Sequence, residues 1–175
     1  MCCCFGVTMN FKKQDEAKMP HVVIIGGGFG GLHAARCLRN SPFKVTLVDK
    51  RNFHLFQPLL YQVATGGLSP GDIASPLRAV FHRYKNIHVA MDEVMDIDPQ
   101  ARKIIFKDGE MEYNHLVIAT GACHHYFGNS QWAALAPGLK TIEDAITIRH
   151  RILKAYEMAE LETDLQKQKS LLTFV

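Results

Sequence analysis

The sequence lacks a long uninterrupted apolar run, a CxxC pair and a strong excess of charge of either sign. Its longest nearly apolar stretch, Val22 to Leu32, is short and rich in glycine, which excludes a membrane-spanning helix. The five cysteines follow no even, spaced pattern, which excludes a disulfide scaffold and a zinc knuckle and favours a reducing compartment. The net charge of +3 is too small to indicate a nucleic-acid partner.

The composition is that of a folded globular domain, with 47% hydrophobic and 21% charged residues among 175. This length suffices for one hydrophobic core with tails and falls short of two full-sized domains. Residues 1–19 contain neither a secretory signal nor a myristoylation glycine, and we expect a disordered N-terminal extension there. S-acylation or metal binding stays open as an alternative for Cys2, Cys3 and Cys4.

A glycine-rich turn follows the first apolar run. His21–Ile25 is a short β-branched run, typical of a strand buried in a parallel sheet. The next residues fit GxGxxG: Gly26 makes a tight turn, Gly28 allows backbone to approach a diphosphate, and Gly31 lets a helix pack on the strand. The pattern of Phe29–Asn40 predicts that helix, whose N-terminus attracts anions.

A second apolar strand, Lys44–Asp49, ends in an acidic residue. A carboxylate at this position suits the hydroxyl groups of a ribose and disfavours NADP, because it repels a 2′-phosphate. Further on, Leu116–Gly121 predicts another buried strand. Between them we expect a small antiparallel meander with a hairpin at Asp108-Gly109, made of residues Ile87–Ala90, Glu93–Ile97, Lys103–Phe106 and Met111–Tyr113. The fold class is therefore α/β, a Rossmann-like dinucleotide-binding domain that carries a meander.

This order of elements resembles the FAD half of flavoprotein reductases that bind two dinucleotides. The stretch Asn52–Leu68, with its FQPLLYQVATG segment, is similar to type II NADH dehydrogenases, as are Ala119–Ala122 and Tyr126–Asn129. These enzymes are single-chain NADH:quinone oxidoreductases that pump no protons. The resemblance runs from about His21 to Val175. It implies that FAD is the cofactor, that NADH is the substrate, and that two electrons pass to a membrane quinone.

The resemblance also assigns cofactor contacts, although it assigns no catalytic residue. It assigns the diphosphate to Gly26, Gly28, Phe29, Gly30 and Gly31. The ribose of the adenosine is assigned to Asp49 and the adenine side to Val94, with Lys50 as a further cofactor contact. The flavin is assigned to Thr120 and Gly121, with Gln57 and Pro58 in the segment near its ring system. For Phe56, Leu59, Leu60 and Tyr61 a place in the core and a cofactor contact stay equally open. The histidines are scattered and predict no metal site.

Two absences distinguish the sequence from related reaction types. No cysteine lies between Asp49 and Gly67, which argues against dithiol exchange. A sulfide:quinone reductase-like reaction is therefore a minor alternative, for which Cys123 is the one cysteine near the expected flavin. The apolar residues 170–175 predict the first strand of an NADH-binding domain that the sequence does not go on to supply.

We therefore expect residues 20–169 to form an incomplete FAD-binding domain, a fragment that is inactive alone because NADH must stack on the flavin. A stand-alone, non-catalytic FAD- or NAD-binding module is the alternative. By resemblance, C-terminal segments outside this sequence would hold the enzyme peripherally at the cytoplasmic face of the membrane. A homodimer stays open. No nucleic-acid partner is expected, because an apolar helical stripe from Leu77 to Tyr84 leaves its basic residues on the solvent side.

Overall fold

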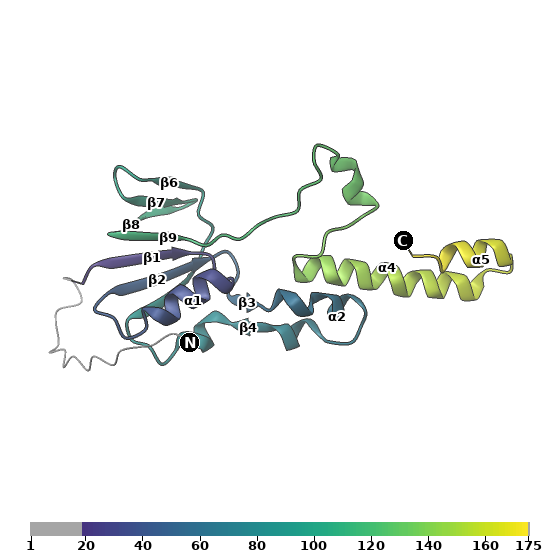
Figure 1. The fold of residues 1–175 in the computed structure, drawn as a ribbon, viewed down its shortest axis with the longest axis horizontal. Helices are drawn as coiled ribbons and strands as arrows, with labels where there is room; N and C mark the ends of the chain where they lie inside the picture. The colour runs from purple at the N-terminus through teal and green to yellow at the C-terminus, as the bar shows by residue number, and fades with distance from the viewer. Residues whose placement is uncertain (1–18, 175) are drawn as a thin grey trace, which may run out of the picture. The chain divides into compact units, whose positions relative to one another are not determined.

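The computed structural model describes residues 19–174, and Figure 1 shows their secondary structure. The chain divides into two compact units. The first contains the described residues up to Arg51 together with Phe81–Ala119, and the second contains Asn52–Val80 together with the residues from Thr120 onward. The predicted extension at residues 1–19 lies outside the described residues except for Met19. The predicted domain boundaries at 20 and 169 stay a prediction.

The first unit is built on a four-stranded parallel sheet of order β5-β2-β1-β9. Its strands are β1 (His21–Ile25), β2 (Lys44–Asp49), β5 (Ile87–Met91) and β9 (His115–Ile118). The register aligns Val22 with Val45 on one side and with His115 on the other. β1 and β2 are buried almost along their whole length, as their β-branched runs predict.

The assignment of Ile87–Ala90 to the meander was wrong, because these residues belong to β5 and pair in parallel with β2. The long connection that separates β2 from β5 includes helices, and such a crossover lets a strand return parallel to its neighbour. The helix after the glycine turn, α1 (Phe29–Cys37), lies against the sheet and ends earlier than predicted. Its end coincides with a turn in which Ser41 N–H and Oγ donate to the Leu38 carbonyl.

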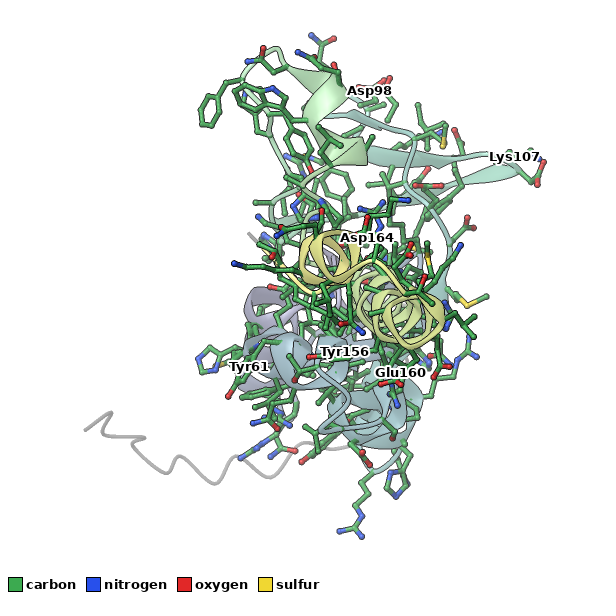
Figure 2. All side chains as sticks on the ribbon, turned by 90° about the vertical axis from the view of Figure 1, so that its right-hand side faces the viewer. Tyr61, Asp98, Lys107, Tyr156, Glu160 and Asp164 are labelled. Atoms are coloured by element: carbon green, nitrogen blue, oxygen red, sulfur yellow. The ribbon has the colours of Figure 1, made fainter. Side chains whose placement is uncertain are left out.

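A three-stranded antiparallel meander completes the first unit, with β6 (Asp96–Asp98), β7 (Lys103–Phe106) and β8 (Gly109–Glu112). The β7–β8 hairpin is confirmed, with Lys107 at its tip in Figure 2 and with Gly109 at a φ of 149°. Ile104 and Phe106 are buried against Val23 and Val48, so the meander closes one face of the sheet. The strand expected from Glu93 begins only at Asp96.

The second unit is mainly helical. A short antiparallel pair, β3 (Phe53–Leu55) and β4 (Ala74–Pro76), accompanies the helices. The helices are η2 (Gln57–Leu59), α2 (Leu60–Ala64), η3 (Pro70–Ile73), α3 (Leu77–Phe81), η4 (Ser130–Ala134), α4 (Ile142–Leu161) and α5 (Leu165–Leu171). α2 packs on the start of α4 around Leu60, Val63 and Ala145.

In the segment after β3, the four residues for which core and cofactor contact stayed equally open differ in burial. Leu60 is core, with 1% of its surface exposed, and Leu59 is half-buried against the same cluster. Phe56 and Tyr61 are exposed by 42% and 54% and are not core residues. In α3, Leu77 and Phe81 are buried whereas Arg78 is exposed, which confirms an amphipathic helix over Leu77–Phe81. The predicted stripe is longer than the helix, because Tyr84 lies beyond its end.

The C-terminal strand predicted for residues 170–175 is wrong over the described part of that range. Ser170 and Leu171 close helix α5, and residues 172–174 form no strand. The cause is local: the Asp164 side chain accepts hydrogen bonds from Gln166 N–H and Lys167 N–H and so starts a helix. None of the helices between residues 19 and 174 is both long enough and apolar enough to cross a bilayer.

Candidate functional site

The turn after β1 requires glycine at two positions because of its backbone conformation and its contact with α1. Gly26 has a φ of 105°, and its N–H donates to the Val48 carbonyl at 2.7 Å. A Cβ on Gly31 would lie 1.7 Å from the Gly26 carbonyl oxygen. Gly26 therefore makes the turn, and Gly31 lets α1 pack directly against it.

Gly28 differs, because the protein itself gives no reason for the missing side chain. A Cβ at Gly28 would meet no atom of the described residues within 4 Å, and Gly28 is exposed with an extended backbone at the N-cap of α1. A Cβ at Gly30 would make only an ordinary contact with Ala119, at 3.6 Å. No side chain among residues 19–174 caps α1, and its first turn contains no acidic residue. The open space above Gly28 thus lies at a helix N-terminus whose dipole favours an anion.

Asp49, at the end of β2, is held in place by the backbone around it. Its Oδ2 accepts a hydrogen bond from Gly27 N–H, and its Oδ1 accepts one from Arg51 N–H at 2.7 Å. A carboxylate offers about four acceptor positions, so an oriented group with spare acceptor capacity stands beside the glycine turn. Asp92 N–H donates to the Asp49 carbonyl, which brings the segment containing Val94 alongside.

Two further predicted residues of this unit, Val94 and Lys50, make contacts with other residues of the protein. Val94 is half-buried against the core formed by the meander and the sheet. The Lys50 ammonium lies 3.7 Å from the Glu93 carboxylate, and both side chains are 65% exposed, so this ion pair adds little stability.

The order of the strands in the sheet also indicates a ligand site beside the glycine turn and Asp49. From β1 the chain passes to β2 and β5 on one side and later to β9 on the other, so the strand order reverses between β1 and β9. In open parallel sheets, ligands bind beyond the carboxyl ends of the strands at such a reversal. The glycine turn follows β1 at this position, and Asp49 ends the adjacent strand β2.

The other predicted residues belong to the second unit. Gln57 Nε2 donates to the Lys140 carbonyl at 3.1 Å, and Pro58 lies in the first turn of η2. Thr120 and Gly121 follow β9 along the chain; both are exposed, and Gly121 has a φ of 76°.

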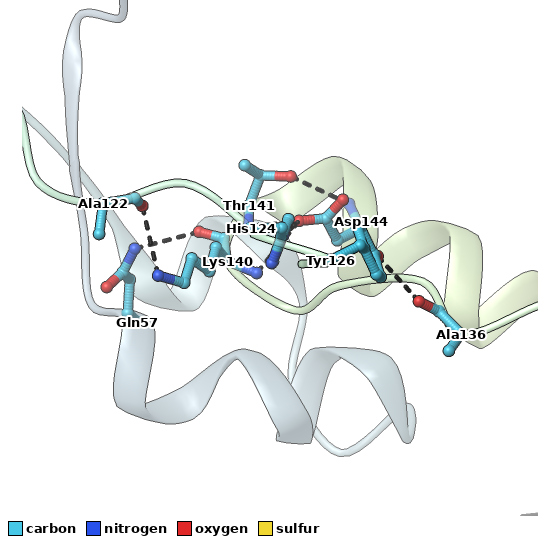
Figure 3. Close-up of polar contacts among 8 residues, drawn as sticks. All are labelled: Gln57, Ala122, His124, Tyr126, Ala136, Lys140, Thr141 and Asp144. Atoms are coloured by element: carbon cyan, nitrogen blue, oxygen red, sulfur yellow. Dashed lines mark hydrogen bonds and ion pairs between the residues drawn. The ribbon is translucent and has the colours of Figure 1, made fainter. Parts of the chain in front are cut away.

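A polar cluster around Asp144, drawn in Figure 3, was missed by sequence reasoning. Asp144 Oδ2 accepts hydrogen bonds from Lys140 N–H at 3.1 Å, from Thr141 N–H at 2.9 Å and from His124 Nε2 at 3.1 Å. Partial burial raises the pKa of Asp144, but the hydrogen bonds from His124, Lys140 and Thr141 outweigh it and lower the pKa to about 2. The Thr141-x-x-Asp144 pattern predicts the helix cap, whereas no local signal points to His124.

Comparison with known proteins places the chain in a family. Residues 20–162 match the pattern of the pyridine nucleotide-disulphide oxidoreductases, and the chain therefore belongs to that family. Within it, the chain is a homologue of type II NADH:quinone oxidoreductases, which confirms the predicted resemblance and the Rossmann-like α/β fold. NdhA of Mycobacterium tuberculosis, one of these enzymes, is 50% identical over 158 residues, covering 88% of this chain and 34% of that protein.

Solved structures of related proteins resemble this chain in fold. NDH2 from Plasmodium falciparum, in complex with RYL-552, has a TM-score of 0.74 at 28% identity and covers 87% of this chain and 32% of its own. The sulfide:quinone oxidoreductase from Aquifex aeolicus has a TM-score of 0.72 at 33% identity and covers 79% and 32%. The chain thus spans about a third of the length of the relatives it matches.

Proposed function

We propose that the chain binds FAD and supplies the FAD-binding part of an NADH:quinone oxidoreductase. The observation that carries the proposal is the open space above Gly28, at the N-terminus of α1 and beside an oriented Asp49 carboxylate. The relatives add the chemistry, because NdhA is named as an NADH:quinone oxidoreductase. Bound FAD would take a hydride from NADH and deliver two electrons to a quinone.

The residues of the first unit have defined tasks in this proposal. Gly28 allows the diphosphate to approach the backbone, and the first turn of α1 stabilises its negative charge. Asp49 accepts hydrogen bonds from the ribose hydroxyls and repels a 2′-phosphate. Its bonds from Gly27 and Arg51 fix the carboxylate before the ligand arrives, which reduces the entropy lost on binding.

The proposal extends to the remaining residues that the family resemblance assigned. Phe29 and Gly30 would border the diphosphate, and Lys50 and Val94 the adenosine. Gln57, Pro58, Thr120 and Gly121 would contact the flavin. NADH and quinone would be the partners of the complete reaction.

A second candidate reaction has support from the likeness to the Aquifex aeolicus sulfide:quinone oxidoreductase. Oxidation of sulfide by such a flavoprotein would require thiols that carry sulfur to the flavin. In the part of the chain that the structure describes, Cys123 is the cysteine closest in sequence to Thr120 and Gly121, and Cys37 is on α1. A single cysteine near the flavin segment makes NADH oxidation the better-supported proposal.

The test is FAD binding by the chain, measured by equilibrium dialysis with visible flavin absorbance. Gly28→Val should weaken FAD binding more than tenfold, because its side chain fills the space kept for the diphosphate. The thermal unfolding temperature should fall only slightly: the extended backbone accepts a Cβ and no described atom lies within 4 Å of it, but valine caps a helix less well than glycine. Gly71→Ala, at an exposed and uncrowded glycine, is the control and should change neither quantity.

Unchanged FAD affinity in Gly28→Val would show that the diphosphate assignment is wrong. Asp49→Ala should also weaken binding, about tenfold, by removing the ribose acceptor. It removes the partner of Gly27 and Arg51 as well, so its unfolding temperature should fall in parallel. Tighter binding of NAD than of FAD would favour the alternative of a non-catalytic module.

A further inference from the structure

The segment that supplies Thr120 and Gly121 has no regular secondary structure to hold it. Between the end of β9 and the start of α4, the only helical element is the short η4. Thr120 is exposed, Gly121 has a φ of 76°, and a Cβ on Gly121 would meet nothing within 4 Å. Before the turn, Ala119 N–H donates to the Ile25 carbonyl at 2.8 Å. The side of the turn that follows Gly121 has no strand or helix next to it and depends on the residues after it for its position.

Those residues are anchored to the cap of α4 by two side chains, visible in Figure 3. Lys140 Nζ donates to the Ala122 carbonyl at 3.4 Å. Two residues further on, His124 Nε2 donates to Asp144 Oδ2 at 3.1 Å. Asp144 is already fixed by Thr141, because each donates a backbone N–H to the other's side chain. His124 thus attaches its segment to a point that is itself rigid.

The ring of His124 also occupies the space above a glycine. A Cβ on Gly138 would lie 2.1 to 2.3 Å from three atoms of the imidazole. Any side chain at this position would push the ring away from Asp144. Helix capping gives no reason for this arrangement, since Thr141 and Asp144 complete the cap without His124.

We propose that His124, Asp144 and Gly138 form an anchor that positions the Thr120–Gly121 turn for the flavin cofactor. The inference rests on the proposed function for its ligand, because FAD has to be the group that this turn contacts. His124 is a positioning residue: it holds the turn and takes no part in the electron transfer itself.

The test combines two variants that break the anchor by different means. His124→Ala removes the donor, and Gly138→Ala displaces the ring while both polar partners remain. In both, backbone ¹⁵N order parameters of residues 121–124 should fall toward the flexible range, below about 0.6, whereas those within α4 stay unchanged. The dissociation constant for FAD should rise about tenfold in both.

Two further variants separate positioning from general stability. His124→Gln keeps an N–H donor of similar reach and should restore both readouts toward the values of the unchanged chain. Tyr126→Phe removes a bond from the same segment, Tyr126 Oη to the Ala136 carbonyl at 2.8 Å, and should change neither readout.

Unchanged order parameters at residues 121–124 in both anchor variants would overturn the anchor. Lower order parameters with unchanged FAD affinity would overturn its role for the cofactor, and so would an equal fall throughout α4. Failure of the unchanged chain to bind FAD would instead overturn the proposed function and the cofactor part of this inference, while the comparison of order parameters would still decide whether the anchor exists.

Discussion

Single residues in this chain combine local and long-range tasks, and His21 at the start of β1 is an example. Its Nε2 contacts Thr46 Oγ1 at 2.8 Å and its Nδ1 contacts the Glu112 carbonyl at 2.9 Å. Its backbone N–H donates to Asn114 Oδ1 at 2.7 Å. One imidazole therefore links two strands of the sheet to the end of the meander.

The pH dependence of stability should reflect this position. Burial, followed by the nearby Lys44 charge, lowers the pKa of His21 below 6.5, although the Glu112 carbonyl opposes the change. The neutral ring is favoured in the folded state, so its contribution is complete above pH 6.5 and is lost as the pH falls through the folded pKa. Thermal unfolding followed by circular dichroism should show this loss of stability as the pH falls below 6.5, and His21→Gln should lack it.

Asp144 should act in a separate, more acidic window. Its pKa of about 2 lies below the ordinary value of 3.8, so its contribution is complete above 3.8 and is lost as the pH falls toward 2. The same titration on Asp144→Asn should lose this second phase and keep the phase that belongs to His21. A single phase removed by both variants would contradict the separation.

At the scale of elements, the cap of α5 allows a direct test. Asp164, labelled in Figure 2, accepts hydrogen bonds from Gln166 N–H at 2.8 Å and from Lys167 N–H at 3.4 Å. Asp164→Ala should destabilise this short helix by about 1 kcal/mol, and amides of residues 168–172 should exchange faster. Thr163→Ala, next to the cap, serves as the control. Equal exchange in the two variants would mean that packing on α4 alone maintains α5.

The sequence predicted elements best where burial follows from a local pattern. β1 and β2 have the predicted bounds, because each is a continuous β-branched run that ends at a turn. Whether Ile87–Ala90 joins the sheet or the meander depends on pairing with β2, which no local pattern reports. The apolar residues 170–175 favour a strand by themselves, and this local pattern does not include the Asp164 cap that starts a helix six residues earlier.

In the candidate site, too, the residues that follow a local pattern were predictable and those that depend on long-range contacts were not. The glycine turn and Asp49 are recognisable because their spacing in the sequence corresponds to a single βαβ unit. The contact between His124 and Asp144 joins residues separated by 20 positions, and it depends on Gly138, whose role is visible only in three dimensions.

For the molecule as a whole, apolar side chains on α4 and α5 predict self-association. Leu153, Tyr156 and Met158 are exposed on α4, and Leu161 and Leu165 at its end and at the start of α5 are more so. Water-exposed apolar area of this kind favours association. Light scattering should show a mass that rises with protein concentration. Leu161→Lys combined with Leu165→Lys should reduce it, whereas Glu160→Lys alone, next to the patch, should not.

The order of the strands also has a consequence for folding during synthesis. β1 lies in the middle of the sheet, but its second neighbour, β9, begins only at His115. When β2 and β5 have left the ribosome, the edge of β1 that will pair with β9 still has unpaired backbone groups. The side chains beside that edge are apolar and are buried in the folded protein. Closing this pair brings together residues about 93 positions apart, and such long-range contacts form slowly. We therefore expect the docking of β9 to limit the folding rate, and the growing chain to be most prone to aggregation just before that strand emerges.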